Sequence, residues 1–244
     1  MTVKIFILFP GGQGFECSGT LLNHRFVLTA GHCIKDWDGH GLASAITVVP
    51  AIDGSYMPYG SYQAANWTTS GHWAAGPDYR FDWGLIRLSA RVGDALGNAA
   101  LHPANEYDLS TTQYVSRGYP GMLAGTPNSG SVPDPRRGNF MWESFDNRGL
   151  QVPTFGECAE GGGHHDEYFL CNYADSTDGQ SGSGAWLTHL FGREVYAINS
   201  HDAYYWPPEL QANNVEMRIR SDNVASMVTW MNNEPAYRQS YLLP

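Results

Sequence analysis

Short apolar runs separated by polar turns make up most of the chain, and long helical repeats are rare. The first run, Val3–Phe9, ends at Pro10-Gly11-Gly12. Two further runs, Cys17–Leu22 and Arg25–Ala30, are joined by the polar pair Asn23-His24. Apolar runs of this length between turn residues are typical of β-strands, and the short polar connection predicts a hairpin. The first part of the chain is therefore predicted to be β-structure.

The alternation of strands and turns continues in the second half, after the polar connection Leu101–Ser110. Beyond Ser221, apolar residues recur at helical spacing as far as Met231, which predicts a helix capped by Ser221 and packed on the second half. We expect an N-terminal domain over 1–105, a C-terminal domain with its helix over 106–234, and a tail over 235–244. Strands of the second half are predicted near residues 113–119, 139–145, 167–172, 184–190, 194–200 and 215–219.

The composition supports a folded, loop-rich protein with little helix. Hydrophobic residues make up 42% and charged residues 16% of the 244 positions, with 28 glycines and 14 prolines. The net charge of −10 argues against nucleic acid or an anionic membrane surface as a partner, because both recruit basic patches. No apolar run reaches membrane-spanning length. We therefore expect no nucleic-acid partner and no membrane partner.

The four cysteines form two local pairs, Cys17 with Cys33 and Cys158 with Cys171. Neither pair has the C-x-x-C spacing of a zinc or redox site. An even number of cysteines at hairpin-like separations favours two disulfides and an oxidising compartment, with four buried thiols as the alternative. We expect a secreted or extracellular protein, although no signal peptide is visible, because the run Ile5–Phe9 is too short for one.

Three short stretches contain candidate catalytic groups. In Gly179-Gln180-Ser181-Gly182, a serine lies among small residues whose backbone N–H groups can converge on a developing oxyanion. His32 follows the predicted strand 25–30, where a fixed imidazole can serve as a general base. Asp82 directly precedes an apolar strand, and a buried carboxylate there needs a partner such as His32. Taken alone, such a serine stretch is most often a turn, and such a histidine is most often structural.

Together, His32, Asp82 and Ser181, in that order and each in its own motif, resemble the triad of the trypsin/chymotrypsin superfamily of serine endopeptidases. An α/β-hydrolase would instead place the acid and the histidine after a serine in G-x-S-x-G, and this chain has neither that order nor the last glycine. Five further motifs resemble the glutamyl-endopeptidase branch of the superfamily: Pro58-Tyr59-Gly60-Ser61-Tyr62, Phe81-Asp82-Trp83-Gly84-Leu85-Ile86, Gly118-Tyr119-Pro120, Met141-Trp142 and Gln180-Ser181-Gly182-Ser183.

The resemblance implies an all-β fold of two six-stranded Greek-key β-barrels, chymotrypsin-like, with a C-terminal α-helix. It implies that His32 is the base, that Asp82 orients it and that Ser181 is the nucleophile. The N–H groups of Gly179 and Ser181 would form the oxyanion hole. The expected substrates are proteins or peptides, cleaved by a monomer that needs no cofactor. The alternative is a catalytically inactive homologue that acts as a binding protein.

By the same resemblance, Asp175 and Ser176 lie at the base of the primary specificity pocket. Asn199, Ser200 and Asp202 belong to its edge and to the strand that pairs with the substrate. The glutamyl branch usually has histidine in place of Asn199, and asparagine has no positive charge to offer a substrate carboxylate. The acidic residues nearby also disfavour an acidic P1 side chain. Glutamyl specificity is therefore not expected, and the P1 preference stays open.

The run His164-His165-Asp166-Glu167 contains residue types that bind metals. Neighbouring residues on a strand point to opposite faces, however, and a glycine-rich hairpin tip is normally solvated. No metal site is therefore expected.

Overall fold

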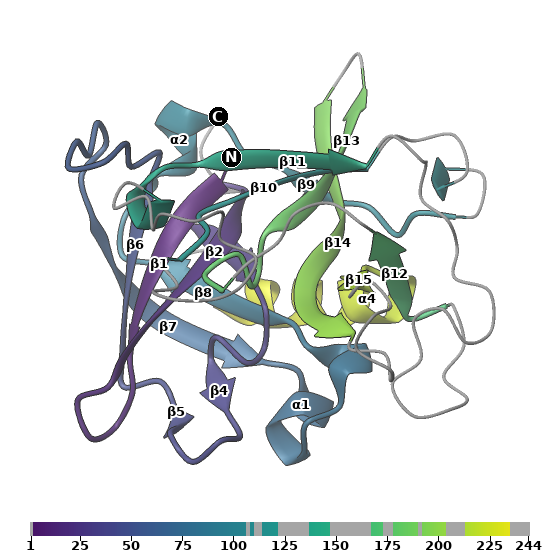
Figure 1. The fold of residues 1–244 in the computed structure, drawn as a ribbon, viewed down its shortest axis with the longest axis horizontal. Helices are drawn as coiled ribbons and strands as arrows, with labels where there is room; N and C mark the ends of the chain where they lie inside the picture. The colour runs from purple at the N-terminus through teal and green to yellow at the C-terminus, as the bar shows by residue number, and fades with distance from the viewer. Residues whose placement is uncertain are drawn as a thin grey trace, which may run out of the picture.

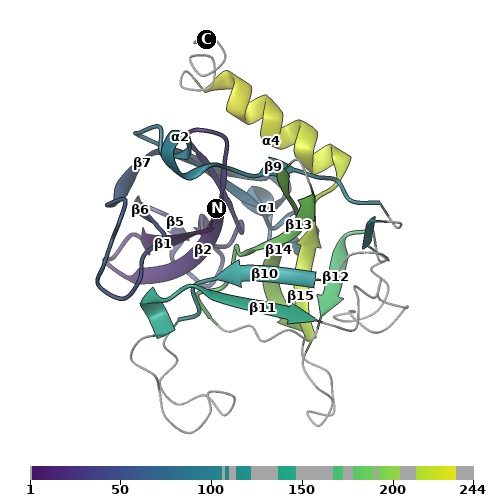
Figure 2. The ribbon, with the colours of Figure 1, turned by 90° about the horizontal axis from the view of Figure 1, so that it is seen from above.

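The structure is a computed structural model that describes residues 2–105, 108–109, 114–121, 137–146, 167–172, 178–189, 192–203 and 213–234. Most of its strands are antiparallel, and they form a barrel and a second sheet (Figure 1). The barrel and the sheet lie side by side, with one long helix along them (Figure 2). The predicted mostly β fold with a C-terminal helix is confirmed.

Six strands close the barrel in the order β1, β2, β3, β8, β7 and β6, and all pairings are antiparallel. Alternate side chains of β1, Val3, Ile5 and Ile7, are buried in the core, as the period of a strand requires. The predicted hairpin is β2–β3, with Asn23 at a positive φ in its turn. The strands are β1 Thr2–Leu8, β2 Gly14–Leu22, β3 Phe26–Thr29, β6 Ala45–Pro50, β7 Tyr62–Thr69 and β8 Gly84–Leu88.

Short elements connect the barrel strands and lead to the second sheet. Two of them flank the candidate residues, because the β4–β5 hairpin follows His32 and the 3-10 turn η1 directly precedes Asp82. The short elements are β4 Lys35–Asp36, β5 Gly41–Leu42, α1 Gly71–Ala75, η1 Tyr79–Phe81, α2 Gly93–Leu96, β9 Ala100–Leu101 and, before β11, η2 Arg137–Asn139.

The second sheet has the strand order β11, β10, β13, β14, β15 and β12, with β9 paired to β14 as the seventh strand. Each of the six strands predicted in the second half corresponds to one of the strands β10 to β15. The long strand β14 is central to the sheet and extends towards the barrel (Figure 1). The bounds are β10 Tyr114–Gly118, β11 Trp142–Asp146, β12 Phe169–Asn172, β13 Gly184–His189, β14 Gly192–Ala203 and β15 Asn213–Arg218.

The helix α4, Ser221–Asn233, contacts the barrel, and its buried Met227 and Met231 share one hydrophobic core cluster with residues of both the barrel and the second sheet. The ring of Trp230 meets that of Phe26 edge-on, with the centroids 5.7 Å apart. Glu234, which caps the helix, accepts a hydrogen bond from Arg87 Nε at 2.6 Å. Because only two residues separate β15 from α4, the chain leaves the second sheet at once and crosses to the barrel.

The N-cap of α4 is Arg220, so that Ser221, the predicted cap, is the first residue of the helix instead. Val224 donates its backbone N–H to Arg220 O at 2.9 Å, which closes the first turn. Within the described ranges, no helix combines the length and the apolar character that crossing a membrane requires.

A disulfide joins Cys17 in β2 to Cys33, the residue after His32. The two cysteines are 16 positions apart, and closing a loop of this size stabilises a fold by about 3 kcal/mol. The bond confirms one predicted pair and anchors the segment that carries His32. The other predicted pair includes Cys158, which lies outside the described residues.

Candidate active site

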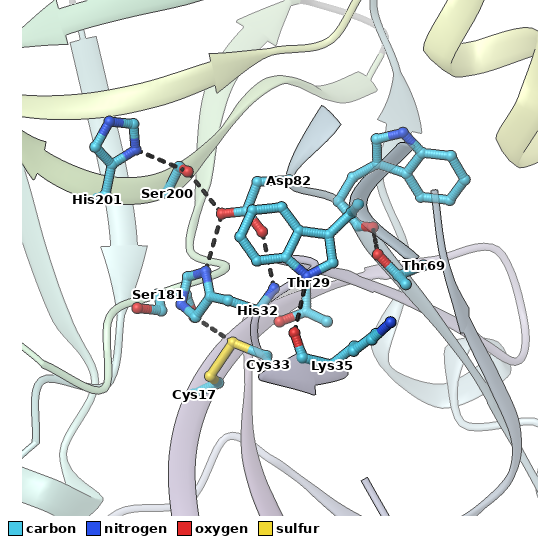
Figure 3. A network of polar contacts seen from close by, with 12 residues as sticks. Cys17, Thr29, His32, Cys33, Lys35, Thr69, Asp82, Ser181, Ser200 and His201 are labelled. Carbon is cyan, nitrogen blue, oxygen red and sulfur yellow. Dashed lines mark hydrogen bonds and ion pairs between the residues drawn. A yellow bond between two sulfur atoms is a disulfide. The ribbon is translucent and has the colours of Figure 1, made fainter. Parts of the chain in front are cut away.

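His32 and Asp82 meet where β3 and β8 pair in the barrel. Thr29, at the end of β3, pairs with Gly84, at the start of β8, so the residues just beyond them lie side by side. Asp82 Oδ2 is 2.9 Å from His32 Nδ1, and Asp82 Oδ1 accepts the backbone N–H of His32 at 2.8 Å (Figure 3). The Asp82 side chain is fully buried, whereas 28% of the His32 side chain is exposed. The structure thus brings the predicted acid and histidine together.

Asp82 has a further partner in β14, because the Ser200 hydroxyl donates to Asp82 Oδ2 at 2.6 Å. Burial raises the pKa of Asp82, but the charge and the hydrogen bonds of His32 and the hydroxyl of Ser200 outweigh it and lower that pKa. Burial likewise opposes the protonation of His32, but the Asp82 carboxylate outweighs it and raises the pKa of His32 above 6.5. An ionised carboxylate therefore faces an imidazole that is easily protonated.

The loop that carries Ser181 is held on two sides. On the barrel side, the Ser18 N–H donates to Ser181 O at 2.9 Å, and the Ser18 hydroxyl donates to Gly179 O at 2.8 Å. On the sheet side, the Gly182 N–H donates to Asn199 O at 2.8 Å. The loop is therefore fixed between β2 and β14.

These contacts bring Ser181 close to His32. The carbonyl oxygen of Ser181 is 3.8 Å from Cys33 Sγ, and a ring nitrogen of His32 lies within 4.8 Å of the same sulfur. Figure 3 shows the Ser181 side chain beside the His32 ring. The three candidate catalytic residues, which come from three separate motifs, therefore share one site.

Two backbone N–H groups of the serine loop have no protein acceptor among the described residues, those of Gly179 and Ser181. By contrast, the N–H groups of Gly182 and Ser183 both donate to carbonyl oxygens at 2.8 Å. These are the two groups that the resemblance assigns to an oxyanion hole. Such donors on a fixed loop can stabilise a developing negative charge.

Of the predicted pocket residues, the side chains of Asn199 and Ser200 are described. Asn199 is buried, and its Nδ2 donates to Oε1 of the fully buried Glu216 at 3.1 Å. Ser200 donates its hydroxyl to Asp82. The sequence predicted Ser200 at the pocket edge but did not predict this contact. The other predicted pocket side chains lie outside what the structure describes, namely Asp175, Ser176 and Asp202.

Three residues at the site were not predicted from the sequence as contacts. Ser18 holds the serine loop, and Glu216 binds Asn199. His201 Nδ1 lies 3.1 Å from Ser200 Oγ. Neighbouring residues of a regular strand point to opposite faces, but the register of β14 shifts between Asn199 and His201. A hydrophobic pattern gives no sign of such a bulge, so this contact had no signal in the sequence.

One group of residues with metal-ligand atoms is present in the described part of the chain, Cys17, His32 and Cys33. The two cysteines are joined in a disulfide and so offer no thiolate. This group therefore does not form a metal site. The histidines of the run at 164–167 lie outside the described residues.

Comparison with known protein families shows to which family the chain belongs. The family model described as Trypsin matches residues 4–225, a span that includes His32, Asp82 and Ser181. The chain belongs to the trypsin family. The match covers the barrel, the second sheet and the start of α4.

Two curated relatives match parts of this trypsin-family chain. An extracellular metalloprotease of Bacillus subtilis is 37% identical over 97 residues, which make up 39% of this chain and 31% of the relative. A glutamyl endopeptidase of Bacillus licheniformis is 34% identical over 112 residues, 46% of this chain and 35% of the relative. The matched part thus spans about a third of the length of these relatives.

Solved structures share the fold of this trypsin-family chain. A Glu endopeptidase in complex with MPD superposes with a TM-score of 0.68 at 18% identity, covering 93% of this chain and 88% of that one. The protease Anisep from Arthrobacter nicotinovorans has the same TM-score at 19% identity and covers 92% of both chains. The chymotrypsin-like architecture expected from the resemblance is confirmed.

The close approach of the serine loop to the barrel depends on Gly182. Its φ is +84°, and a Cβ there would lie 2.2 Å from Thr29 Oγ1 and 2.4 Å from Ser18 O. Gly60 offers a matched control, because its φ is +71° but a Cβ there would meet nothing within 4 Å.

We predict that Gly182→Ala lowers the free energy of unfolding by about 2–5 kcal/mol, because the strain of a positive φ adds to the clash. Gly60→Ala should introduce only the strain of the positive φ, which lowers the free energy of unfolding by about 1–2 kcal/mol. Unfolding in urea measures both values. Equal losses in the two variants would contradict the close contact at Gly182.

Proposed function

We propose that this chain is a serine endopeptidase that hydrolyses peptide bonds with Ser181, His32 and Asp82. The observation that carries the proposal is the buried Asp82 carboxylate, which holds His32 Nδ1 at 2.9 Å beside the loop of Ser181. Acyl transfer at neutral pH needs a nucleophile, a base within reach of it and a group that orients the base. These three roles match the three residues.

In the proposed reaction, Asp82 accepts the Nδ1–H of His32, which leaves Nε2 as the base. Nε2 takes the hydroxyl proton while Ser181 Oγ attacks the carbonyl carbon, and the same proton then passes to the leaving amine. Water repeats both steps on the acyl-enzyme and releases the new carboxyl group. The imidazolium that forms in each step is stabilised by Asp82, whose charge also raises the pKa of His32.

The N–H groups of Gly179 and Ser181 receive the oxyanion in this mechanism. This role is supported by two observations. Neither N–H group has a protein acceptor among the described residues, and the loop around them is fixed by Ser18 and Asn199. Because the loop is held before substrate binds, the donors need no reorganisation when the negative charge develops.

We infer further that an acidic P1 side chain is disfavoured. The resemblance places Asn199 where a substrate carboxylate would be received, and in this chain the Asn199 amide binds the carboxylate of Glu216. Glu216 is fully buried, and its charge contributes to the raised pKa of Tyr196, so a charge on this carboxylate acts on the groups around it. A second carboxylate brought to the same place would be repelled.

The substrates we propose are proteins or peptides in an extracellular or other oxidising compartment. The Cys17–Cys33 disulfide supports such a compartment, because thiols stay reduced in the cytosol. The matching relative from Bacillus subtilis is named an extracellular enzyme.

Labelling with a fluorophosphonate tests the nucleophile. We predict that the unaltered protein is labelled, that Ser181→Ala is not, and that this variant loses about 10⁶-fold in kcat. Ser183→Ala is the matched control, because Ser183 belongs to the same loop and its side chain is fully buried. It should keep its labelling.

The absence of labelling in the unaltered protein would favour an inactive homologue. Labelling that persists in Ser181→Ala would assign the nucleophile to another residue. A circular dichroism spectrum of each variant checks that it is folded.

Cleavage of a diverse peptide library tests the P1 preference. We predict that cleavage after Glu and Asp does not dominate, and that Glu216→Gln raises the ratio of kcat/KM for Glu over Lys at P1 by about tenfold, since it removes the repelling charge. Glu143→Gln is the control, because that carboxylate is 47% exposed and pairs with Arg117. Dominant cleavage after Glu or Asp by the unaltered protein would contradict the inference.

A further inference from the structure

The polar contacts around Asp82 continue beyond Ser200 to His201. Ser200 Oγ is 2.6 Å from Asp82 Oδ2 and 3.1 Å from His201 Nδ1 (Figure 3). The register of β14 against β15 shifts here, because Asn199 pairs with Glu216 and His201 already pairs with Val215. This bulge leaves Ser200 as the extra residue and allows the adjacent side chains to meet.

The protons in this network can be assigned from the chemistry of the three groups. The Asp82 carboxylate, whose pKa is lowered by His32 and Ser200 against the effect of burial, is ionised at neutral pH and only accepts. The single hydroxyl proton of Ser200 therefore goes to Asp82. A hydrogen bond between Ser200 Oγ and the ring of His201 then requires that Nδ1 of His201 carries the proton and donates it.

The ring of His201 is held in place by aromatic neighbours. The Tyr79 ring, from η1, lies with its centroid 4.2 Å away, and the Phe169 ring, from β12, meets it edge-on at 5.9 Å. Tyr79 is three residues before Asp82, so the same short turn positions both the acid and the ring that packs against His201. The donor atom is thereby kept at one place relative to Ser200.

His201 stays neutral when His32 becomes charged. Burial and the neighbouring His32 lower the pKa of His201 to about 4, although Asp82 acts in the opposite direction. A neutral ring can donate a hydrogen bond to Ser200 without competing with His32 for the charge of Asp82. The arrangement therefore leaves the carboxylate to stabilise His32 alone.

We propose that His201 is a positioning residue, which holds the Ser200 hydroxyl on Asp82 and so fixes the carboxylate that orients His32. The proposal rests on the serine endopeptidase function proposed above, because a fixed carboxylate matters most when His32 acts as a base. With Ser200 held by His201, its hydroxyl proton always points to Asp82. Without His201, the hydroxyl can rotate away, the carboxylate becomes more basic, and it binds the proton of His32 more strongly.

Two variants separate the hydrogen bond from the packing of the ring. His201→Phe keeps an aromatic ring between Tyr79 and Phe169 but has no donor. His201→Asn loses the ring but places an amide N–H near the position of Nδ1. We expect His201→Phe to lower kcat by about fivefold, with KM nearly unchanged, because a loss of this size corresponds to the free energy of one neutral hydrogen bond. We expect His201→Asn to recover most of the lost kcat. The midpoint of the rise of kcat with pH should move upward in His201→Phe.

A double-mutant cycle with Ser200→Ala tests whether His201 acts through Ser200. In the Ser200→Ala background, we expect His201→Phe to change kcat and the pH midpoint no further. An equal effect in both backgrounds, or an effect on KM alone, would overturn the proposal, since either would assign His201 to substrate contact or to packing.

An NMR titration of His32 keeps this inference distinct from the proposed function. The pKa of His32 should be higher in His201→Phe than in the unaltered protein, whether or not the protein cleaves peptides. A raised His32 pKa in a protein that no fluorophosphonate labels would refute the function and support the positioning role. An unchanged His32 pKa in an active, folded variant would refute the positioning role alone.

Discussion

The buried negative charge of Asp82 is the constraint on which the site depends. An isolated carboxylate without solvent is costly, so it must be compensated by hydrogen bonds or by a positive charge. Its partners come from two parts of the fold, since His32 follows β3 of the barrel and Ser200 lies in β14 of the second sheet. His32 contacts both carboxylate oxygens, and Oδ2 gains its second partner, Ser200, only when the sheet lies against the barrel. The contacts of one buried charge thus link the packing of the two sheets to the geometry of the site.

Close backbone approach makes this compensation possible. A Cβ on Gly31 would lie 2.9 Å from Asp82 Oδ1 and 2.7 Å from Thr69 Oγ1, so a larger residue would push the carboxylate away from the N–H of His32. The serine loop meets the barrel in a similar way, through Ser18 and Gly182. The proposed catalytic residues and the contacts that hold the two halves together thus lie in the same few segments. We therefore expect stability and the proposed catalysis to be difficult to change separately in this site.

The sequence predicted those features that depend on local pattern. The strands alternate with turns, and His32, Asp82 and Ser181 each lie in a recognisable motif. Both the fold and the three candidate residues that the structure brings together could therefore be predicted. The additional contacts of α4 with the barrel could not be predicted, because helical spacing shows which face is apolar but not every partner that covers it. The contact of His201 with Ser200 depends on a bulge, which leaves no trace in the pattern. The Asn199–Glu216 contact joins two strands whose register no sequence pattern specified.

The most direct test of the account is the pKa of His32, measured by NMR in the unaltered protein and in Asp82→Asn. Burial alone disfavours the imidazolium, and the charge and hydrogen bond of Asp82, with a smaller effect of Asp36, raise the pKa. We predict a pKa above 6.5 in the unaltered protein and a fall below that value in Asp82→Asn, whose side chain stays nearly the same size but carries no charge. A His32 that titrates at the same pKa in both proteins would contradict it.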